Sequence, residues 1–235
     1  MKTAGGSEAA KRRAGERAAE EVEDGFVVGL GTGSTTAHAI RALGRDVEDG
    51  LEVRGIPTSF QSRQLALEVG IPLTTLDAVD GVDLAIDGAD QVVDDPDAED
   101  DGALIKGGGA AHAREKLVDA AADRFVVVAD PSKLAGTLER PVPVEVVPDA
   151  HTVVADRIRA FGGEPTLREA GEKDGPVVTD NGNLVLDCAF GSIADPDGLS
   201  GSLSQIPGVL EHGLFVGLAD VTYVGREDGV ERRVY

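Results

Sequence analysis

A run of three glycines lies between a cation and a carboxylate in this chain. Lys106 precedes Gly107-Gly108-Gly109, and Glu115 lies early in the helix predicted to follow. The first amides of a helix lack intrahelical acceptors and the helix dipole favours negative charge, so the glycine run predicts an anion site. Lys106 adds a positive charge and Glu115 a potential base, although Glu115 by itself also fits an exposed helix position. Together these residue types indicate proton chemistry on a small phosphorylated molecule.

A second glycine-rich segment, Gly31-Thr32-Gly33-Ser34-Thr35, follows a short apolar run and precedes a predicted helix. Its glycine spacing does not match the dinucleotide fingerprint, and no lysine follows as in a P-loop. The segment is therefore a candidate phosphate cradle. A tight strand-to-helix turn explains it about equally well.

Two carboxylates stand three residues apart in Asp87-Gly88-Ala89-Asp90. Neighbouring carboxylates can share proton transfers because each shifts the pKa of the other. A turn in which the aspartates accept backbone amides is the structural alternative, and for this segment alone it is slightly favoured. A metal site is a rival interpretation, but no histidine lies nearby at ligand spacing.

The elements that must position these segments alternate between strands and helices, which predicts crossover units and a mostly parallel sheet. We expect strands at 26–30, 51–56, 71–75, 82–86 and 124–129, and helices at 7–24, 35–43, 60–70 and 110–123. Ligands bind at the carboxyl ends of the strands in such sheets. The three segments above follow strands at that edge, and Asp130-Pro131-Ser132-Lys133 is a fourth. This convergence is more specific than any one segment.

The pattern changes after Lys133 to the α+β character of a compact insert. Prolines around 142–147 favour an edge or connecting strand. A hairpin turn is expected at Asn181-Gly182, and the C-terminal 219–235 is expected to rejoin the first sheet. Further strands are predicted at 165–168, 177–179 and 184–189, with helices at 151–161 and 198–205.

Composition narrows the classes of protein. The net charge of −21 over 235 residues argues against nucleic acid as a partner, and no apolar run is long enough for a membrane span. A single cysteine, Cys188, excludes an internal disulfide, favours a cytoplasmic setting and fits a small core residue. The acidic, lysine-poor composition indicates adaptation to high salt, with the acidic run 94–101 as a solvated loop.

Several motifs occur in one order along the chain, and in that order the sequence resembles ribose-5-phosphate isomerase of the A type. Besides the segments above, the resemblance rests on Arg114-Glu115-Lys116, Ser132-Lys133, Pro143-Val144-Glu145-Val146, 178–183 and 206–209. It covers the chain from about residue 25 to the end. Gln91 stands where the family often has glutamate. The resemblance does not explain the polar N-terminal extension.

The resemblance implies a Rossmann-like domain (1–139 and 209–235) with a smaller ferredoxin-like domain (140–208), in a homodimer or homotetramer. It implies interconversion of D-ribose 5-phosphate and D-ribulose 5-phosphate with no cofactor and no metal. Glu115 would be the base. The remaining implied site residues are Thr32, Gly33, Ser34, Thr35, Asp87, Gly88, Ala89, Asp90, Lys106, Gly107, Gly108, Gly109 and Lys133.

The residue types suit that chemistry, because one carboxylate can move a proton between C1 and C2 while Lys106 and glycine amides stabilise an enediolate. Lys133 with Ser132 is one candidate for the phosphate and the glycine loop is the other. Two rival functions remain. A sugar-phosphate sensor would carry a DNA-binding module, which the sequence lacks, and an amino-sugar phosphate deaminase would need a well-placed histidine.

We predict that stability depends on salt. Forty-three acidic residues against twenty-two basic ones repel one another unless counterions screen them. The melting temperature, followed by circular dichroism, should rise markedly from dilute buffer to molar KCl. An unchanged melting temperature across that range would contradict this prediction.

Overall fold

The structure is a computed structural model that describes residues 6–93, 102–171 and 174–235. The described chain forms two compact units. One comprises residues 6–89, 114–134 and 218–235, and the other comprises residues 90–93, 102–113, 135–171 and 174–217. Each unit is described separately below.

The first unit is built on a six-stranded sheet whose order is β14-β13-β6-β3-β1-β2. All neighbouring pairs are parallel except the edge hairpin β13–β14, which confirms that the C-terminal segment rejoins this sheet. We call it the Rossmann-like unit. Its strands are β1 (Val27–Leu30), β2 (Arg54–Pro57), β3 (Leu84–Gly88), β6 (Phe125–Ala129), β13 (Val221–Gly225) and β14 (Val230–Val234).

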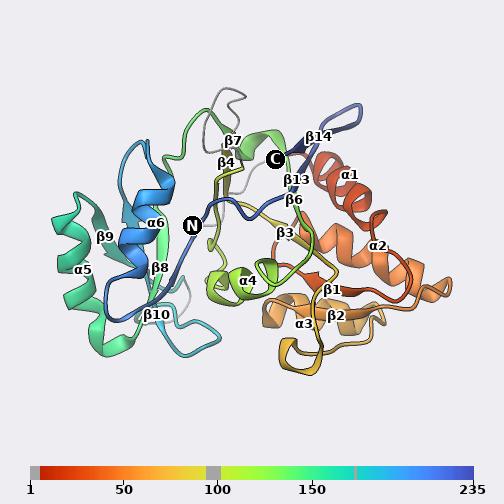
Figure 1. The fold of residues 1–235 in the computed structure, drawn as a ribbon, viewed down its shortest axis with the longest axis horizontal. Coiled ribbons are helices and arrows are strands. Elements are labelled where there is room, and N and C mark those ends of the chain that lie inside the picture. Colours follow the sequence, from red (N-terminus) through yellow and green to blue (C-terminus); the bar gives the residue numbers. More distant parts are fainter. Residues whose placement is uncertain (1–5, 94–101, 172–173) are drawn as a thin grey trace. The chain divides into compact units, whose positions relative to one another are not determined.

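Helices cover both faces of this sheet because its central strands are apolar on both sides. Val28 and Leu30 of β1 belong to the apolar cluster that also holds residues of the first three helices, whereas Val27 packs with Val118 of the fourth. Figure 1 shows the first two helices, in red and orange, side by side. The helices are α1 (Glu8–Ala19), α2 (Thr36–Glu48), α3 (Phe60–Glu68) and α4 (His112–Asp119).

The strand order reverses direction at β1. The chain passes from β1 through α2 to β2 on one side, whereas β3 and β6 lie on the other side of β1. Such a switch point leaves a crevice at the carboxyl ends of the two central strands, where open α/β sheets bind ligands. The segments after β1 and β3 are the two predicted from sequence, Gly31–Thr35 and Asp87–Asp90.

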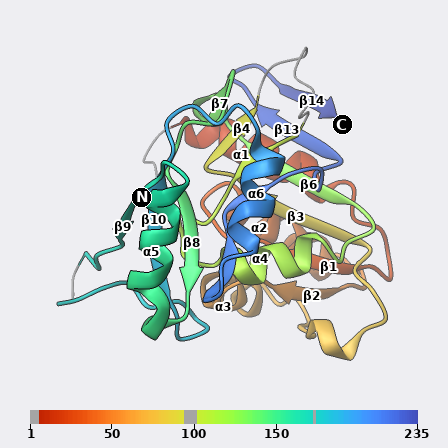
Figure 2. The same cartoon turned by 60° about the vertical axis from the view of Figure 1, so that its left-hand side comes forward.

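The second unit contains a β-α-β-β-α-β segment whose four-stranded antiparallel sheet has the order β11-β8-β10-β9, which is the ferredoxin-like arrangement. Figures 1 and 2 both show its two helices beside these strands. We call it the ferredoxin-like unit. Its elements are β8 (Val142–Val146), α5 (His151–Ala160), β9 (Glu164–Leu167), β10 (Leu184–Ala189), α6 (Pro196–Ser204) and β11 (Val209–His212).

The expectation that 142–147 is an edge or connecting strand is wrong, because β8 is buried and paired on both sides. Pro143 is tolerated there because β11 ends at His212. Beyond that residue, the Pro143 carbonyl accepts a hydrogen bond from the Gly213 amide at 2.7 Å. The Gly213 carbonyl, which would face a donor at position 143, accepts the Lys106 amide at 2.8 Å instead, so the missing proline N–H leaves no acceptor unpaired there.

Two other predicted strands are reduced to isolated bridges. Residues 71–75 contribute only the Gly55–Leu73 bridge, and residues 177–179 contribute only the Val178–Leu184 bridge. A small sheet in the order β12-β5-β4-β7 was not expected, because its strands have two or three residues each and leave no periodicity to detect. They are β4 (Gln91–Val93), β5 (Leu104–Ile105), β7 (Leu134–Ala135) and β12 (Leu214–Phe215).

Several other expectations can be compared with the described residues. Cys188 is fully buried in the apolar cluster of the ferredoxin-like unit, and burial raises the pKa of its thiol, so it is a core residue as predicted. None of the described helices is long and apolar enough to cross a membrane. The acidic run 94–101 lies outside the described residues. Compactness does not test independent folding, so the domain boundaries at 139/140 and 208/209 stay predictions.

A close contact between α1 and β13 provides a test of the Rossmann-like unit. A β-carbon at Gly225 would lie 1.8 Å from the Ala10 carbonyl oxygen, whereas one at Gly229 would meet no atom within 4 Å. We predict that Gly225→Ala lowers the free energy of unfolding by about 1–3 kcal/mol, because α1 must move away. Gly229→Ala is the matched control and should change it by less than about 0.5 kcal/mol. Equal effects in chemical denaturation would argue against this packing.

Candidate active site

A buried aspartate links the ends of β1 and β3 in the Rossmann-like unit. Asp87 is fully buried, and its Oδ1 atom accepts hydrogen bonds from the Thr32 amide at 2.9 Å and the Gly88 amide at 2.6 Å. A β-carbon at Gly31 would lie 2.2 Å from the Asp87 carboxyl carbon, so only glycine permits this approach. The two segments predicted from sequence are thus directly bonded.

The end of β2 joins the same edge through hydroxyl groups. Thr32 Oγ1 lies 2.9 Å from Thr58 Oγ1 and donates to Ser59 Oγ at 2.7 Å. Ser59 also caps α3 by accepting the Ser62 amide. The Thr32 side chain is therefore held by the hydroxyl groups of Thr58 and Ser59.

The start of α2 presents unpaired amides at this edge. Within the part of the chain that the structure describes, the amides of Ser34, Thr35 and Thr36 make no hydrogen bond, whereas the next amide, of Ala37, donates to the Gly33 carbonyl. Thr35 at the helix N-terminus makes no side-chain cap. The α2 N-terminus thus has the free donors that an anion requires.

Glu115 lies in the first turn of α4 and is 4% exposed. Two neighbours fix the helix: the Arg114 Nε atom donates to the Pro57 carbonyl at the end of β2, and Val118 packs against Gly29 of β1. The start of α4 therefore lies at the carboxyl edge of the sheet. Glu115 therefore lies near the positive end of the α4 dipole, where a carboxylate group is electrostatically favoured.

The end of β6 carries the fourth predicted segment. Asp130 is fully buried, and its Oδ1 accepts the Ser132 amide at 2.9 Å, which closes a short turn ending at Lys133. Its Oδ2 has no hydrogen-bond partner within the described parts of the chain. The backbone of this turn therefore fixes the position of the Cα atom of Lys133, whose side chain is half-buried.

In the ferredoxin-like unit, Lys106 is 2% exposed, and its ammonium lies 5.4 Å from the centre of the Phe215 ring. Its amide donates to the Gly213 carbonyl at 2.8 Å. A cation over an aromatic face is attracted by the ring quadrupole, so the Phe215 ring is a favourable neighbour for an ammonium group at this buried position.

The glycine loop that follows is tight and strained. Gly107 has a φ of 98°, and the Ala110 amide closes the turn onto the Gly107 carbonyl at 3.0 Å. Ala110 itself has a φ of 59°, which costs about 1 kcal/mol or more in a residue with a side chain. Asp90, half-buried, accepts the Gly108 amide at 2.6 Å, so it is bonded to the loop.

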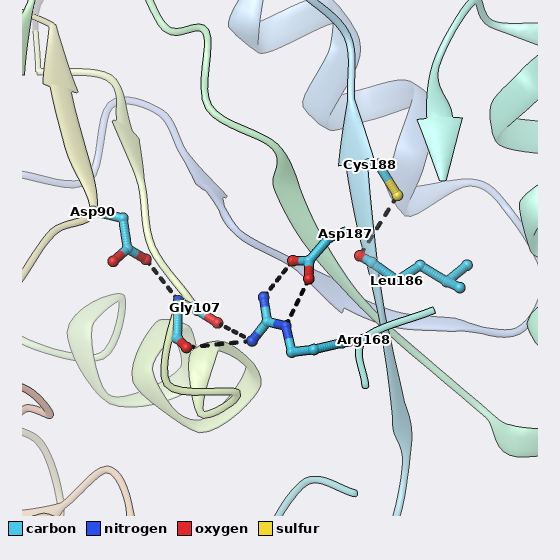
Figure 3. A network of polar contacts seen from close by, with 7 residues as sticks. Asp90, Gly107, Arg168, Leu186, Asp187 and Cys188 are labelled. Carbon is cyan, nitrogen blue, oxygen red and sulfur yellow. Dashed lines mark hydrogen bonds and ion pairs between the residues drawn. The ribbon is translucent and has the colours of Figure 1, made fainter. Parts of the chain in front are cut away.

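Sequence reasoning missed two residues that hold this loop. Arg168, just after β9, donates to the Gly107 carbonyl, and Asp187 of β10 holds the Arg168 guanidinium (Figure 3). Sixty residues separate Arg168 from the loop, and nothing in the local pattern signals the contact. No group of three or more histidine, cysteine or acidic residues able to hold a metal occurs in the described part of the chain.

Comparison with known proteins gives a consistent match. The family model described as ribose 5-phosphate isomerase A (phosphoriboisomerase A) matches residues 54–229. Ribose-5-phosphate isomerase A of Halorubrum lacusprofundi is 68% identical over 235 residues, covering 98% of each chain. The solved structure of ribose 5-phosphate isomerase A from Methanocaldococcus jannaschii is 44% identical, with a TM-score of 0.92, covering 98% of this chain and 100% of that chain.

A D-ribose-5-phosphate isomerase solved in complex with phospho-erythronic acid is also similar, at 42% identity and a TM-score of 0.92, covering 98% of this chain and 100% of that chain. The family model matches most of the chain, and the Halorubrum lacusprofundi relative covers 98% of it at 68% identity. The chain therefore belongs to the ribose 5-phosphate isomerase A family.

Proposed function

We propose that this chain interconverts D-ribose 5-phosphate and D-ribulose 5-phosphate, a step of the non-oxidative pentose phosphate pathway. One observation carries the proposal. A nearly buried carboxylate, Glu115, lies at the carboxyl edge of the Rossmann-like sheet, where the α2 amides are unpaired. A base beside an anion site is what proton transfer on a sugar phosphate requires.

In the proposed reaction, Glu115 removes the C2 proton of the open-chain aldose and returns it to C1 after the double bond has formed between them. The hydroxyl proton on O2 moves to O1, so the product is an isomer with no net gain or loss of atoms. A single carboxylate suffices because the two carbons are adjacent. Asp87, already bonded to two amides, is proposed to move the ring-oxygen proton when the furanose opens.

The phosphate is proposed to bind the free amides of Ser34, Thr35 and Thr36, together with the Lys133 ammonium. Both belong to the Rossmann-like unit, and both follow strands at the same edge of its sheet. Helix N-termini bind phosphate through unpaired amides and the dipole. Thr32 and Gly33 complete this segment, and Gly88 and Ala89 provide backbone next to Asp87.

Lys106 and the three glycines of the loop are proposed to stabilise the enediolate. Lys106 contributes charge, and the amides of Gly107, Gly108 and Gly109 contribute fixed dipoles. Donors held in place before the reaction need no reorganisation when negative charge develops. Asp90 is proposed to contact the substrate hydroxyls while it holds Gly108. The mechanism requires neither a metal nor an organic cofactor.

We also propose that the protein acts in the cytoplasm as a homodimer or homotetramer and that it is adapted to high salt. The single buried thiol and the net charge of −21 support this setting. Gel filtration with light scattering in molar KCl measures the oligomeric state directly.

The proposed function is tested by adding D-ribose 5-phosphate to the purified protein in molar KCl and following the appearance of ketose. Turnover is expected. Binding without turnover would instead favour a sugar-phosphate sensor. Release of ammonia from an amino-sugar phosphate, with no ketose from ribose 5-phosphate, would favour a deaminase.

Glu115→Gln should nearly abolish isomerisation while sugar-phosphate binding persists. Glutamine keeps the size of the side chain but cannot accept the C2 proton, and general base catalysis alone contributes about 10²–10⁴-fold. The measurements are kcat and the calorimetric Kd for ribose 5-phosphate. Asp123→Asn, which changes an exposed carboxylate beyond α4, is the control and should retain activity. Near wild-type kcat in Glu115→Gln would move the role of base to Asp87 or Asp90.

Lys106→Met should lower kcat about a hundredfold or more with a much smaller change in KM, since an oxyanion-stabilising donor acts mainly in the transition state. Methionine keeps an apolar side chain over Phe215, so Lys106→Met removes the charge without removing the packing. Lys106→Ala removes both and should lower the stability as well. If only KM rose in steady-state kinetics, Lys106 would belong to the phosphate site instead.

A further inference from the structure

A planar cation lies behind the glycine loop of the ferredoxin-like unit. The Arg168 Nη1 atom donates to the Gly107 carbonyl at 2.9 Å and to the Gly108 carbonyl at a longer 3.4 Å. The remaining edge of the guanidinium is occupied by Asp187, which accepts from Nε at 2.9 Å and from Nη2. Figure 3 shows Arg168 lying between Asp187 and the loop.

This contact sets the direction of the loop amides. In a trans peptide, the N–H points away from the C=O of the same peptide group. Because Arg168 binds the Gly107 and Gly108 carbonyls, the Gly108 and Gly109 amides must point away from it. The Gly108 amide accordingly donates to Asp90 Oδ2 on the other side. The Gly109 amide has no acceptor within the described ranges of the chain and belongs to an exposed residue.

The contact also changes the strength of these donors. A guanidinium on a carbonyl oxygen draws electron density from the peptide group, so the N–H of that group becomes a better donor, as in any hydrogen-bond chain. The side chain of Arg168 is 10% exposed and that of Asp187 is 24% exposed, so solvent screens the polarisation only partly. The loop also contains Ala110, whose positive φ is strained. Such a backbone conformation persists only where the surrounding structure enforces it.

We propose that Arg168, held by Asp187, is a positioning residue for the isomerisation. It orients the glycine loop so that the Gly109 amide points at the oxygen that becomes negative in the enediolate. Through the Gly108 amide it also fixes the position of the Asp90 carboxylate. The inference rests on the proposed function. It assigns Arg168 no contact with the substrate. Lysine cannot replace it, because only a planar fork spans a carboxylate on one edge and carbonyls on another.

Kinetics of Arg168→Lys, Arg168→Met and Asp187→Asn test the proposal in molar KCl. We expect kcat to fall by about tenfold to a hundredfold, as for a misplaced donor, with KM changed less than about threefold. The inhibition constant of phospho-erythronic acid, a negatively charged phosphorylated acid, should rise by about the same factor by which kcat falls. Arg159→Met is the matched control, since Arg159 pairs with Asp156 at 2.7 Å within α5 of the same unit, and should leave all three values unchanged.

A second readout does not depend on turnover. In protein labelled with ¹⁵N-glycine and assigned by substitution, the Gly108 and Gly109 amide resonances should shift in Arg168→Lys and stay in place in Arg159→Met. Wild-type kcat in a folded Arg168 variant, an effect on KM alone, or unmoved glycine resonances would each overturn the proposal. If the wild-type chain failed to isomerise ribose 5-phosphate, the proposed function would fall, and the glycine resonances would still decide whether Arg168 sets the loop.

Discussion

The hydrogen bonds from the Thr32 and Gly88 amides to the buried Asp87 carboxylate are the interaction on which the Rossmann-like unit's edge depends. They join the ends of β1 and β3 at the point where the strand order reverses. A buried carboxylate without such donors would carry a large desolvation cost. With them, the cost is offset and two loops are fixed against each other. The absence of a β-carbon at Gly31 is a condition of this arrangement, because any side chain there would overlap Asp87.

The glycine loop shows the same use of backbone groups in the ferredoxin-like unit. Asp90 accepts one loop amide, and Arg168 binds the carbonyls on the opposite side. In both units a charged side chain orients peptide groups: Asp87 accepts the Thr32 and Gly88 amides, and Arg168 binds the Gly107 and Gly108 carbonyls. An acidic chain with few lysines can build anion sites in this way, since backbone amides carry no net charge. This fits the surface charge expected of a protein in high salt.

Much of the Rossmann-like unit could be predicted from sequence. Alternating apolar runs and helices predicted its strands, and the edge rule predicted that Gly31–Thr35 and Asp87 would come together, because both depend on local periodicity and one general property of parallel sheets. The interior position of β8 could not be predicted, since Pro143 locally favours an edge and only the end of β11 makes it tolerable. Arg168 was missed for the same reason. Its partners are sixty residues away, and single-sequence patterns carry no information on such contacts.

The proposed reaction depends on one step, in which a carboxylate moves the C2 proton through an enediolate without a metal. It is tested most directly with D-ribose 5-phosphate deuterated at C2, turned over by the wild-type protein in molar KCl and EDTA. We expect sustained turnover with deuterium appearing in the water, because a proton held on a carboxylate can exchange before it is returned. Loss of turnover in EDTA, with turnover restored by a divalent cation and the deuterium then fully retained at C1, would indicate a metal-dependent hydride shift and contradict proton transfer by a carboxylate.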